Sequence, residues 1–287
     1  MSEISEERLL AAFDALVSES VIIYGSFESI KIEDEAYPME FRICPAFLTK
    51  PHTVGAANPT FAKSRRWGPG SDMYCPDERL ILTQLNQTHD LAFNLFCADR
   101  PQLLMLTLDS FRRQHEALDL DDLTVMLEVL RLFPSMYTIY NCGEKGGCSR
   151  VHKHQQALMG PPYAFTTLIQ AQEKNEKEKI PYRFFAHHFT QGFNKTSPSD
   201  LLAIYTDLLG QCRQVLSLND EELCPHNVAM WDNWLIMIPR QAGSVDGASA
   251  NTGGILGSVW MSERNGVDDW LRIGCANVLS RLGVPSR

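Results

Sequence analysis

The sequence predicts an α+β protein built from two halves, each of which alternates short strands with a helix. Short apolar runs bounded by turn residues indicate strands that pair in an antiparallel way. Apolar residues recur every three or four positions through 121–133, which is typical of a helix packed on a sheet. The charged segment 170–180 is most simply a solvated helix or a linker. We therefore place the boundary there, which gives halves 1–170 and 171–287.

The first half is expected to begin with an amphipathic helix, because residues 6–18 carry apolar side chains at helical spacing. Residues 99–101 separate two apolar runs, which indicates an antiparallel hairpin. A later helix begins near Asp121 and ends at Pro134. The expected elements of this half are residues 6–18, 91–97, 103–107, 121–133, 136–140 and 151–159.

Residues 50–78 are rich in Pro, Gly and Ser and contain Lys63, Arg65 and Arg66, so we expect an irregular basic loop that closes over a ligand. The second half is expected to hold a strand, a helix, a hairpin, a small-residue loop that leads into a strand, and one last helix: residues 182–190, 199–216, 227–239, 251–257 and 267–282. The core is expected to include four tryptophans, Trp231, Trp234, Trp260 and Trp270.

Composition and charge exclude several classes of protein. The chain has 287 residues and a formal net charge of −9, which would repel nucleic acid and anionic membranes. A phosphate site must therefore be locally basic. The eight cysteines show no CxxC pair, and no signal segment follows Met1, so we expect reduced thiols and a cytoplasmic or nuclear location. No apolar run approaches the roughly 20 residues that span a bilayer.

The segment SRVHKHQQ is the most informative stretch of the chain. It sets His152, His154 and Gln156 two positions apart, so an extended strand would direct all three from one face. Lys153 and Gln155 would point from the other face. Two imidazoles and an amide are therefore expected to converge on one spot.

A glycine loop leads into this strand. Residues 141–148 read NCGEKGGC, and their three glycines permit backbone conformations that can aim several amide protons at an anion. An imidazole with an ordinary pKa of about 6.5 is largely neutral at cellular pH and can attack phosphorus without first losing a proton. His154 is therefore the candidate nucleophile of a nucleotide site.

Together these motifs resemble the fungal type of ATP adenylyltransferase, also called diadenosine tetraphosphate phosphorylase, within the histidine triad superfamily. The resemblance covers about four fifths of the chain. The segments that carry it are LAFNLF, LLMLTLDSFRRQHEALDLDDL, YNCGEKGGCSRVHKHQQ, HNVAMWDNWLIMIPR and ANTGGILGSVW. It implies two fused histidine-triad-like halves, with antiparallel sheets and packed helices.

The resemblance also implies roles for individual residues. His154 would become transiently adenylylated, Asn94 would lie near the nucleoside, and Lys50 would contact phosphate. The implied catalytic residues are His154, His152, Gln156 and Ser149. The implied substrate-binding residues are Lys50, Asn94, Asn141, Gly146, Gly147, Cys148, Asn251, Thr252 and Gly253.

Four positions depart from the pattern of this family. Leu95 stands where a lysine is usual, Gln102 replaces a histidine, and Cys148 replaces a serine. A basic residue of the second half corresponds to Ser262, although Arg264 is near. These departures concern substrate specificity and catalytic strength more than the type of reaction.

The implied reaction is reversible phosphorolysis of diadenosine tetraphosphate to ATP and ADP through an adenylyl-histidine. Histidine triad hydrolases carry a third histidine where this chain has Gln156. An amide cannot shuttle the proton that attacking water must lose, whereas a phosphate oxygen is already anionic, so phosphate is the expected acceptor. The alternatives are a dinucleotide or nucleoside phosphoramidate hydrolase that uses His154, and a weakly active nucleotide-binding sensor.

Metal ligation is a rival interpretation of the two histidines, since Cys142 or Cys148 could add sulfur ligands. The spacing usual for structural zinc is missing, so we expect no protein-bound metal. Magnesium is expected to arrive with the nucleotide. The expected partners are small molecules, namely diadenosine polyphosphates, ATP, ADP and phosphate, and the chain is expected to be a monomer or a homodimer.

Overall fold

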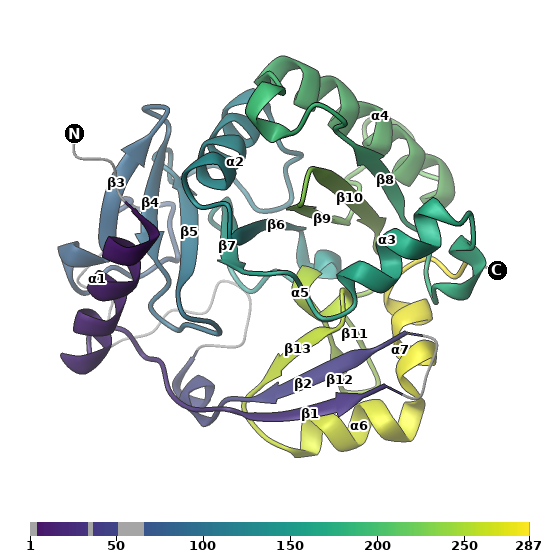
Figure 1. Ribbon diagram of the computed structural model, residues 1–287, viewed down its shortest axis with the longest axis horizontal. Coiled ribbons are helices and arrows are strands. Elements are labelled where there is room, and N and C mark those ends of the chain that lie inside the picture. Colours follow the sequence, from purple (N-terminus) through teal and green to yellow (C-terminus); the bar gives the residue numbers. More distant parts are fainter. Residues whose placement is uncertain (1–4, 34–36, 51–65, 287) are drawn as a thin grey trace.

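The computed structural model describes residues 5–33, 37–50 and 66–286. One large antiparallel sheet crosses the molecule (Figure 1). Within the described residues it has eight strands, in the spatial order β3 (Ile81–Leu85), β4 (His89–Phe93), β5 (Gln102–Thr107), β7 (His154–Met159), β6 (Met136–Cys142), β9 (His226–Trp231), β10 (Trp234–Pro239) and β8 (Phe185–His188). Because β6 pairs with β9, both halves of the chain share this sheet.

Helices cover one face of the large sheet. The helix α2 (Leu120–Leu132) contacts β6, and α4 (Pro198–Leu216) contacts β10 and β8. The helix α1 (Glu6–Ser18) packs Phe13 against Phe93 of β4, with ring centroids 5.7 Å apart. The start of α2 is stabilised by a capping box in which Asp119 and Asp122 exchange backbone and side-chain hydrogen bonds. These helices and the sheet enclose the first hydrophobic core.

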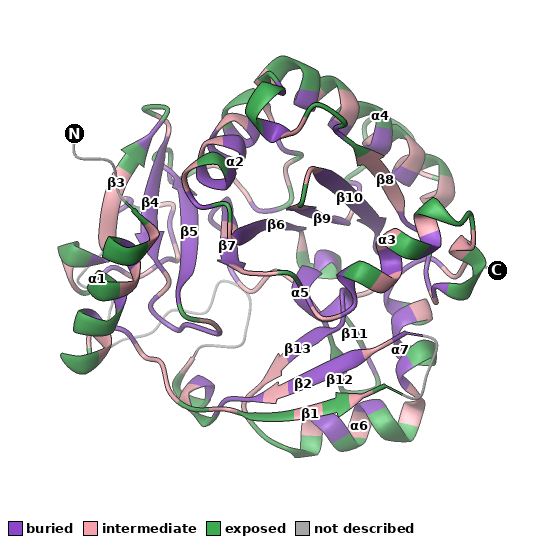
Figure 2. Cartoon of the chain, viewed as in Figure 1, coloured by how far each residue is buried: buried purple, intermediate pink, exposed green. Residues whose placement is uncertain are grey.

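A smaller sheet and several short helices pack against the other side. The small sheet has the order β1 (Glu28–Ile32), β2 (Met39–Ile43) and β13 (Ser258–Met261), and β13 runs parallel to β2. The second core joins Phe41 of β2 and Val259 of β13 to Tyr137 and Ile139 of β6. Figure 2 shows that the central strands are buried while the outer helices expose one side. The remaining α-helices and strands of the described residues are α3 (Phe165–Glu173), β11 (Ser244–Val245), β12 (Ala248–Ser249), α5 (Thr252–Ile255), α6 (Asn265–Ile273) and α7 (Cys275–Leu282).

The α+β class is confirmed, and the large sheet is antiparallel as expected. The hairpin of β9 and β10 turns at Asp232 and Asn233, whose φ angles are 48° and 62°. The small sheet was not predicted, and its β2–β13 pair is parallel. Most residues of β1 are exposed, so residues 28–32 lack the alternation of buried and exposed positions that is typical of a strand. The division of the chain near residue 170 stays a prediction.

Two sequence expectations are wrong in detail. The last segment is not one helix over 267–282, because Gly274 has a φ of 88° and separates α6 from α7. The histidine strand begins at His154, whereas His152 forms only an isolated bridge with Arg113.

No helix within the described ranges is long and apolar enough to cross a lipid bilayer. The basic residues Lys63 and Arg65 lie outside the described residues.

Candidate active site

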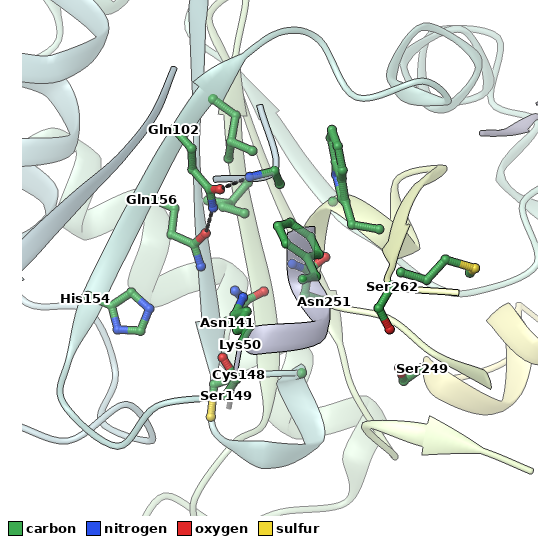
Figure 3. A pocket seen from close by; sticks show the side chains of 18 of the residues that line it. Lys50, Gln102, Asn141, Cys148, Ser149, His154, Gln156, Ser249, Asn251 and Ser262 are labelled. Carbon is green, nitrogen blue, oxygen red and sulfur yellow. Dashed lines mark hydrogen bonds between the residues drawn. The ribbon is translucent and has the colours of Figure 1, made fainter. Parts of the chain in front are cut away.

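A cavity beside the histidine strand lies between one face of β6 and β7 and the second-half loop before α5 (Figure 3). Its volume is about 290 Å³, close to the lower end for small-molecule sites. It is lined by Phe47, Lys50, Ala98, Gln102, Tyr137, Ile139, Asn141, Gly147, Cys148, Ser149, His154, Gln156, Leu158, Ser249, Asn251, Gly253, Trp260, Met261 and Ser262.

His154 is held in the orientation that a nucleophile requires. Its Nδ1–H donates to the carbonyl oxygen of His152 at 2.8 Å, because a carbonyl can only accept. The other ring nitrogen, Nε2, then carries a lone pair, and the ring lines the cavity. The side chain is buried, and this burial lowers the pKa of His154 to about 4. The imidazole is therefore neutral at physiological pH.

Gln114 fixes the backbone of His154 from both sides. Its Oε1 accepts from the amide of His154 at 2.8 Å, and its Nε2 donates to the carbonyl of His154 at 2.9 Å. The same Nε2 donates to the carbonyl of Asn141 at 3.1 Å. This residue was missed in the sequence, where nothing in its neighbourhood marks a contact across forty positions of chain.

His152 does not converge on the cavity as the alternation suggested. Its ring is fully buried, and its Nε2–H donates to the carbonyl of Thr107 at 2.9 Å. Its Nδ1 therefore accepts from the hydroxyl of Ser71 at 2.8 Å. The backbone amide of His152 donates to Asp72 at 3.1 Å. His152 thus positions the carbonyl that holds His154, and it offers no free ring nitrogen to a substrate.

The opposite face of the strand carries Lys153 and Gln155, as the alternation predicts. Both side chains reach Asp122 of α2, with Lys153 Nζ at 2.6 Å and Gln155 Nε2 at 2.8 Å. His89 of β4 lies 3.1 Å from the same carboxylate. This buried cluster attaches the histidine strand to α2 on the face opposite to the cavity.

The glycine loop is shaped by close packing. Gly147 has a φ of 83°, and a Cβ there would lie 2.5 Å from the carbonyl oxygen of Ala250. The amides of Gly146, Gly147 and Cys148 donate to carbonyls within the loop itself. The expectation that these amides point at an anion is therefore wrong, because a 3-10 turn over 144–146 consumes them.

Donors toward the cavity come instead from side chains. The Oδ1 of Asn141 accepts from both the amide and the hydroxyl of Thr252, each at 2.7 Å, so its NH₂ group is the part left to face the cavity. The hydroxyl of Ser149 also lines the cavity. Burial raises the pKa of Cys148 to about 11, so this thiol stays neutral and is a weak donor.

Two of the expected substrate residues act one layer behind the cavity. Thr252 is fully buried, and its one hydroxyl proton is shared between Oδ1 of Asn141 at 2.7 Å and the carbonyl of Tyr140 at 3.0 Å. Gly146 is buried, and its carbonyl accepts from Asn227 Nδ2 at 2.7 Å. Neither residue is among those that line the cavity. The expectation that they contact substrate is not supported, because their polar groups are already paired within the protein.

Asn227 is held in turn by a buried arginine that the sequence did not single out. Arg240 is fully buried and donates to the side-chain oxygen of Asn227. It also donates to the carbonyl of Ala250 at 2.9 Å. Burial lowers the pKa of Arg240 to about 9. Through Asn227, this guanidinium therefore links the glycine loop of the first half to the loop of the second half that contains Ala250.

The cavity is locally basic in an acidic chain. Lys50 lines it, and burial together with the nearby charge of Arg150 lowers the pKa of Lys50 to about 8. Within the part of the chain that the structure describes, no Asp or Glu lines this cavity or the two that adjoin it. The local field therefore favours an anion, as the sequence required of a phosphate site.

Two further cavities, of about 50 and 170 Å³, share Lys50 and Ser149 with the first. His154 and Gln156 also line the smaller one, so they lie at its junction with the main cavity. The other residues around the smaller cavity are Trp67, Met73, Tyr74, Leu80, Phe93, Asn94, Leu95, Phe96, Leu104 and Arg150. Most of these are apolar, in contrast to the polar main cavity.

The second-half loop borders the third cavity. Asn251 lines it together with Trp260, which was expected in the core. Trp260 instead borders both this cavity and the main one, and the guanidinium of Arg42 lies 4.6 Å from its ring centroid. Ser262 lines the main cavity, whereas Arg264 pairs with Glu28 at 2.6 Å and does not line it.

Two family models match the chain. Residues 58–169 match the Ap4A phosphorylase N-terminal domain, and residues 178–285 match the ATP adenylyltransferase C-terminal domain. Ap4A is diadenosine tetraphosphate. Among curated protein sequences, none matches the chain significantly.

The fold is similar to that of yeast Ap4A phosphorylase Apa2. The crystal structure of Apa2 in complex with Ap4A has a TM-score of 0.76 at 20% sequence identity and covers 99% of both chains. The complex of Apa2 with AMP has a TM-score of 0.73 at 20% identity, over 98% of this chain and 96% of that chain. At this identity the likeness establishes the fold alone.

A neutral histidine that faces a cavity rich in amide, hydroxyl and ammonium groups, on a histidine-triad-like fold, defines a nucleotidyltransferase. The two matched domains together cover most of residues 58–285. The chain belongs to the Ap4A phosphorylase family of ATP adenylyltransferases, as its motifs indicated.

Proposed function

We propose that this enzyme catalyses the reversible phosphorolysis of Ap4A through an adenylyl group carried on His154. The observation that carries the proposal is the hydrogen bond from His154 Nδ1–H to the carbonyl of His152, at 2.8 Å. This hydrogen bond leaves the lone pair of Nε2 free on a side chain that lines two cavities, the polar main cavity and the smaller, largely apolar one. Family membership supports the choice of substrate.

The chemistry is a double displacement at one phosphorus atom. In the first step, Nε2 of His154 attacks an α-phosphorus of Ap4A, a nitrogen–phosphorus bond forms, and the bond to the bridging oxygen breaks to release ATP. In the second step, an oxygen of inorganic phosphate attacks the adenylyl group, the nitrogen–phosphorus bond breaks, and ADP leaves. The reverse sequence converts ADP and ATP into phosphate and Ap4A.

The shapes of the cavities suggest how the substrate lies. The largely apolar lining of the smaller cavity matches the base of the nucleoside whose phosphate is attacked, and Asn94 borders it. At about 50 Å³ this cavity would have to widen to admit the base. The main cavity suits the remaining phosphates, beside Lys50, Asn141 and Ser149. The third cavity, bordered by Asn251, suits the far end of the dinucleotide. Phosphoryl and nucleotidyl transfer asks mainly for such alignment and for neutralised charge.

We propose further that magnesium enters with the nucleotide. Magnesium prefers oxygen ligands and is usually held by carboxylates together with substrate phosphates. The described cavity walls present amides, hydroxyls and a lysine, and no carboxylate, so the phosphates themselves would supply its ligands. The location of the protein in the cell and its oligomeric state stay predictions.

The decisive experiment is incubation with Ap4A labelled at its α-phosphorus, in the absence of inorganic phosphate, followed by trapping and mapping of the labelled residue. We expect label on His154 and its loss in His154→Asn. The matched control is His187→Asn, because His187 lies on β8 and borders none of the three cavities. Label on any other residue, or turnover by His154→Asn at the rate of the unmodified enzyme, would refute the mechanism.

A second measurement separates phosphorolysis from hydrolysis. Cleavage of Ap4A that is stimulated by phosphate and yields ADP supports the proposal. Release of AMP at a rate independent of phosphate would identify a hydrolase instead. Tight binding of Ap4A without turnover would identify a nucleotide sensor.

A further inference from the structure

We infer that Gln102 is a positioning residue that turns the amide of Gln156 so that its NH₂ group faces the phosphates. This inference rests on the proposed function, since it concerns how the same site receives an anion. Gln102 stands where the family usually has a histidine, and the sequence alone presents it only as a departure. The structure places its side chain in direct contact with Gln156 (Figure 3).

The direction of the hydrogen-bond chain is set by a backbone group. The amide N–H of Ala98 can only donate, and it donates to Oε1 of Gln102 at 2.7 Å. The NH₂ group of Gln102 is then the other end of its amide, and it donates to Oε1 of Gln156 at 2.7 Å. Gln156 is left with its own NH₂ group for the cavity that it lines.

Burial makes this direction the stable one. Ala98 and Gln102 are only 7% and 5% exposed. If the amide of Gln102 were reversed, its NH₂ group would face the N–H of Ala98, and two buried donors would be left without an acceptor. A buried donor without an acceptor loses its hydrogen bonds to water and gains none in return. The order Ala98, Gln102, Gln156 is therefore fixed without help from solvent.

The sheet register brings the two glutamines together. Gln102 pairs with Leu158 across β5 and β7, and Leu104 pairs with Gln156, so the glutamines are diagonal neighbours on one face. His154 pairs with Leu106 in the same ladder and shares that face. The hydrogen-bonded series Ala98, Gln102 and Gln156, called the relay below, therefore ends beside the nucleophile His154.

The orientation matters because a phosphate oxygen is an acceptor with negative charge. The NH₂ group of Gln156 can donate to it, whereas a reversed amide would present an oxygen and repel it. A neutral histidine at position 102 could also accept from Ala98 and donate to Gln156. Protonation would give that histidine two donors and no acceptor. The glutamine makes the relay independent of pH.

The test is the isosteric Gln102→Glu variant. Its carboxylate can only accept, so it binds the N–H of Ala98 and draws the NH₂ group of Gln156 toward itself, which turns the oxygen of Gln156 to the cavity. We expect kcat for Ap4A phosphorolysis to fall about 10²-fold at pH 8, as when a donor is lost from an anion hole. As pH falls, the acid becomes protonated and can donate to Gln156 again, so kcat relative to the unmodified enzyme should recover.

Two controls separate positioning from packing. Gln191→Glu adds the same charge at an exposed position outside the three cavities and should leave kcat unchanged. Gln102→Met removes the relay without reversing it, so its loss should be smaller and should not recover with pH. If Gln102→Glu does not fold, Gln102→His serves instead, and its kcat should fall as pH drops through about 6.5, the ordinary pKa of histidine.

The relay can also be tested without turnover. Binding of inorganic phosphate at pH 8, measured by calorimetry, should be weaker for Gln102→Glu than for Gln102→Met. If the unmodified enzyme does not cleave Ap4A, the proposed function fails and this comparison still tests the relay. Equal kcat and equal phosphate affinity in the Glu and Met variants, or a loss in Gln102→Glu that does not change with pH, would overturn the inference.

Discussion

Lys153 and Asp122 form an ion pair that is wholly buried behind the catalytic strand, with Nζ 2.6 Å from Oδ2 and neither side chain exposed. Lys153 follows His152 and precedes His154, so the pair ties the site to α2. Its hydrogen bonds to Asp122 and to the carbonyl of Ala117 at 2.7 Å hold the ammonium in place. The strand that carries the nucleophile is therefore anchored by charge on one face and open to ligand on the other.

Removal of one partner of this pair should destabilise the fold strongly. Lys153→Met leaves the carboxylate of Asp122 buried with no opposite charge, and we expect a loss of about 3–5 kcal/mol in the free energy of unfolding. Urea unfolding measures it. Lys145→Met, at an exposed position, is the matched control and should change stability little. A loss below about 1 kcal/mol, as for a surface pair, would contradict the anchoring role.

Low pH should reduce the stability that Asp122 gains from Lys153 and His89. The hydrogen bond from His89 and the charge of Lys153 lower the pKa of Asp122 well below its ordinary value of 3.8, despite its burial. The stability that this carboxylate contributes is therefore fully present above pH 3.8 and is lost as pH falls toward the folded-state pKa.

The neutral state of His154 predicts an unusual pH profile. Burial lowers the pKa of His154 to about 4, so the nucleophilic form persists far below pH 6.5, where an exposed histidine is half protonated. We expect the rate of adenylylation by Ap4A to stay constant down to about pH 5.5 and to fall near pH 4. Single-turnover kinetics without added phosphate measure this step, since Ap4A lacks a terminal phosphate that titrates in this range. An acidic limb at pH 6.5 would contradict the burial of the ring.

Lys50 predicts a loss of affinity at alkaline pH. With a pKa of about 8, its ammonium loses its proton as pH rises, and AMP binding should weaken about tenfold between pH 7 and pH 9. Lys50→Arg should remove this dependence, because a guanidinium keeps its charge in that range. Calorimetric titration with AMP measures both. Equal pH dependence in the two proteins would show that another group is responsible.

The close approach at Gly147 predicts strong intolerance of a side chain. Gly147→Ala would place a Cβ 2.5 Å from the carbonyl oxygen of Ala250 at a φ of 83°, so the glycine loop must shift. We expect weaker AMP binding and a lower melting temperature. Gly210→Ala is the control, since nothing lies within 4 Å of its added Cβ in α4 and it should stabilise by about 1 kcal/mol. Unchanged AMP affinity in Gly147→Ala would contradict the assigned packing.

The choice of acceptor should respond to Gln156. Gln156→His introduces a group that can take a proton from water, so hydrolysis of Ap4A to AMP should rise relative to phosphorolysis to ADP. Chromatography of the products gives the ratio. Gln191→His, on the exposed surface, is the control for an added imidazole. An unchanged ratio would refute the argument that the amide selects phosphate.

The sequence alone was enough for the features that depend only on neighbouring residues, namely helical periodicity and the direction of side chains along a strand. The two-residue alternation placed His154 and Gln156 on one face of a strand and Lys153 on the other, and helical periodicity placed α2 and α4. The glycine loop was expected beside that strand, and Gly147 does border the cavity. Side-chain direction in a strand follows from backbone geometry alone, so these features could be deduced without tertiary contacts.

Only the tertiary structure decided which side chains support the site. Gln114 holds His154 across forty residues of chain, and Gln102 orients Gln156 through strand register. Arg240 holds Asn227, whose Nδ2 donates to the carbonyl of Gly146 in the first half. The same contacts turned His152 away from the cavity and used the loop amides internally. Hydrogen bonds between distant segments depend on how sheets and loops pack, and a residue type such as glutamine carries no local signal of the partner that it will meet.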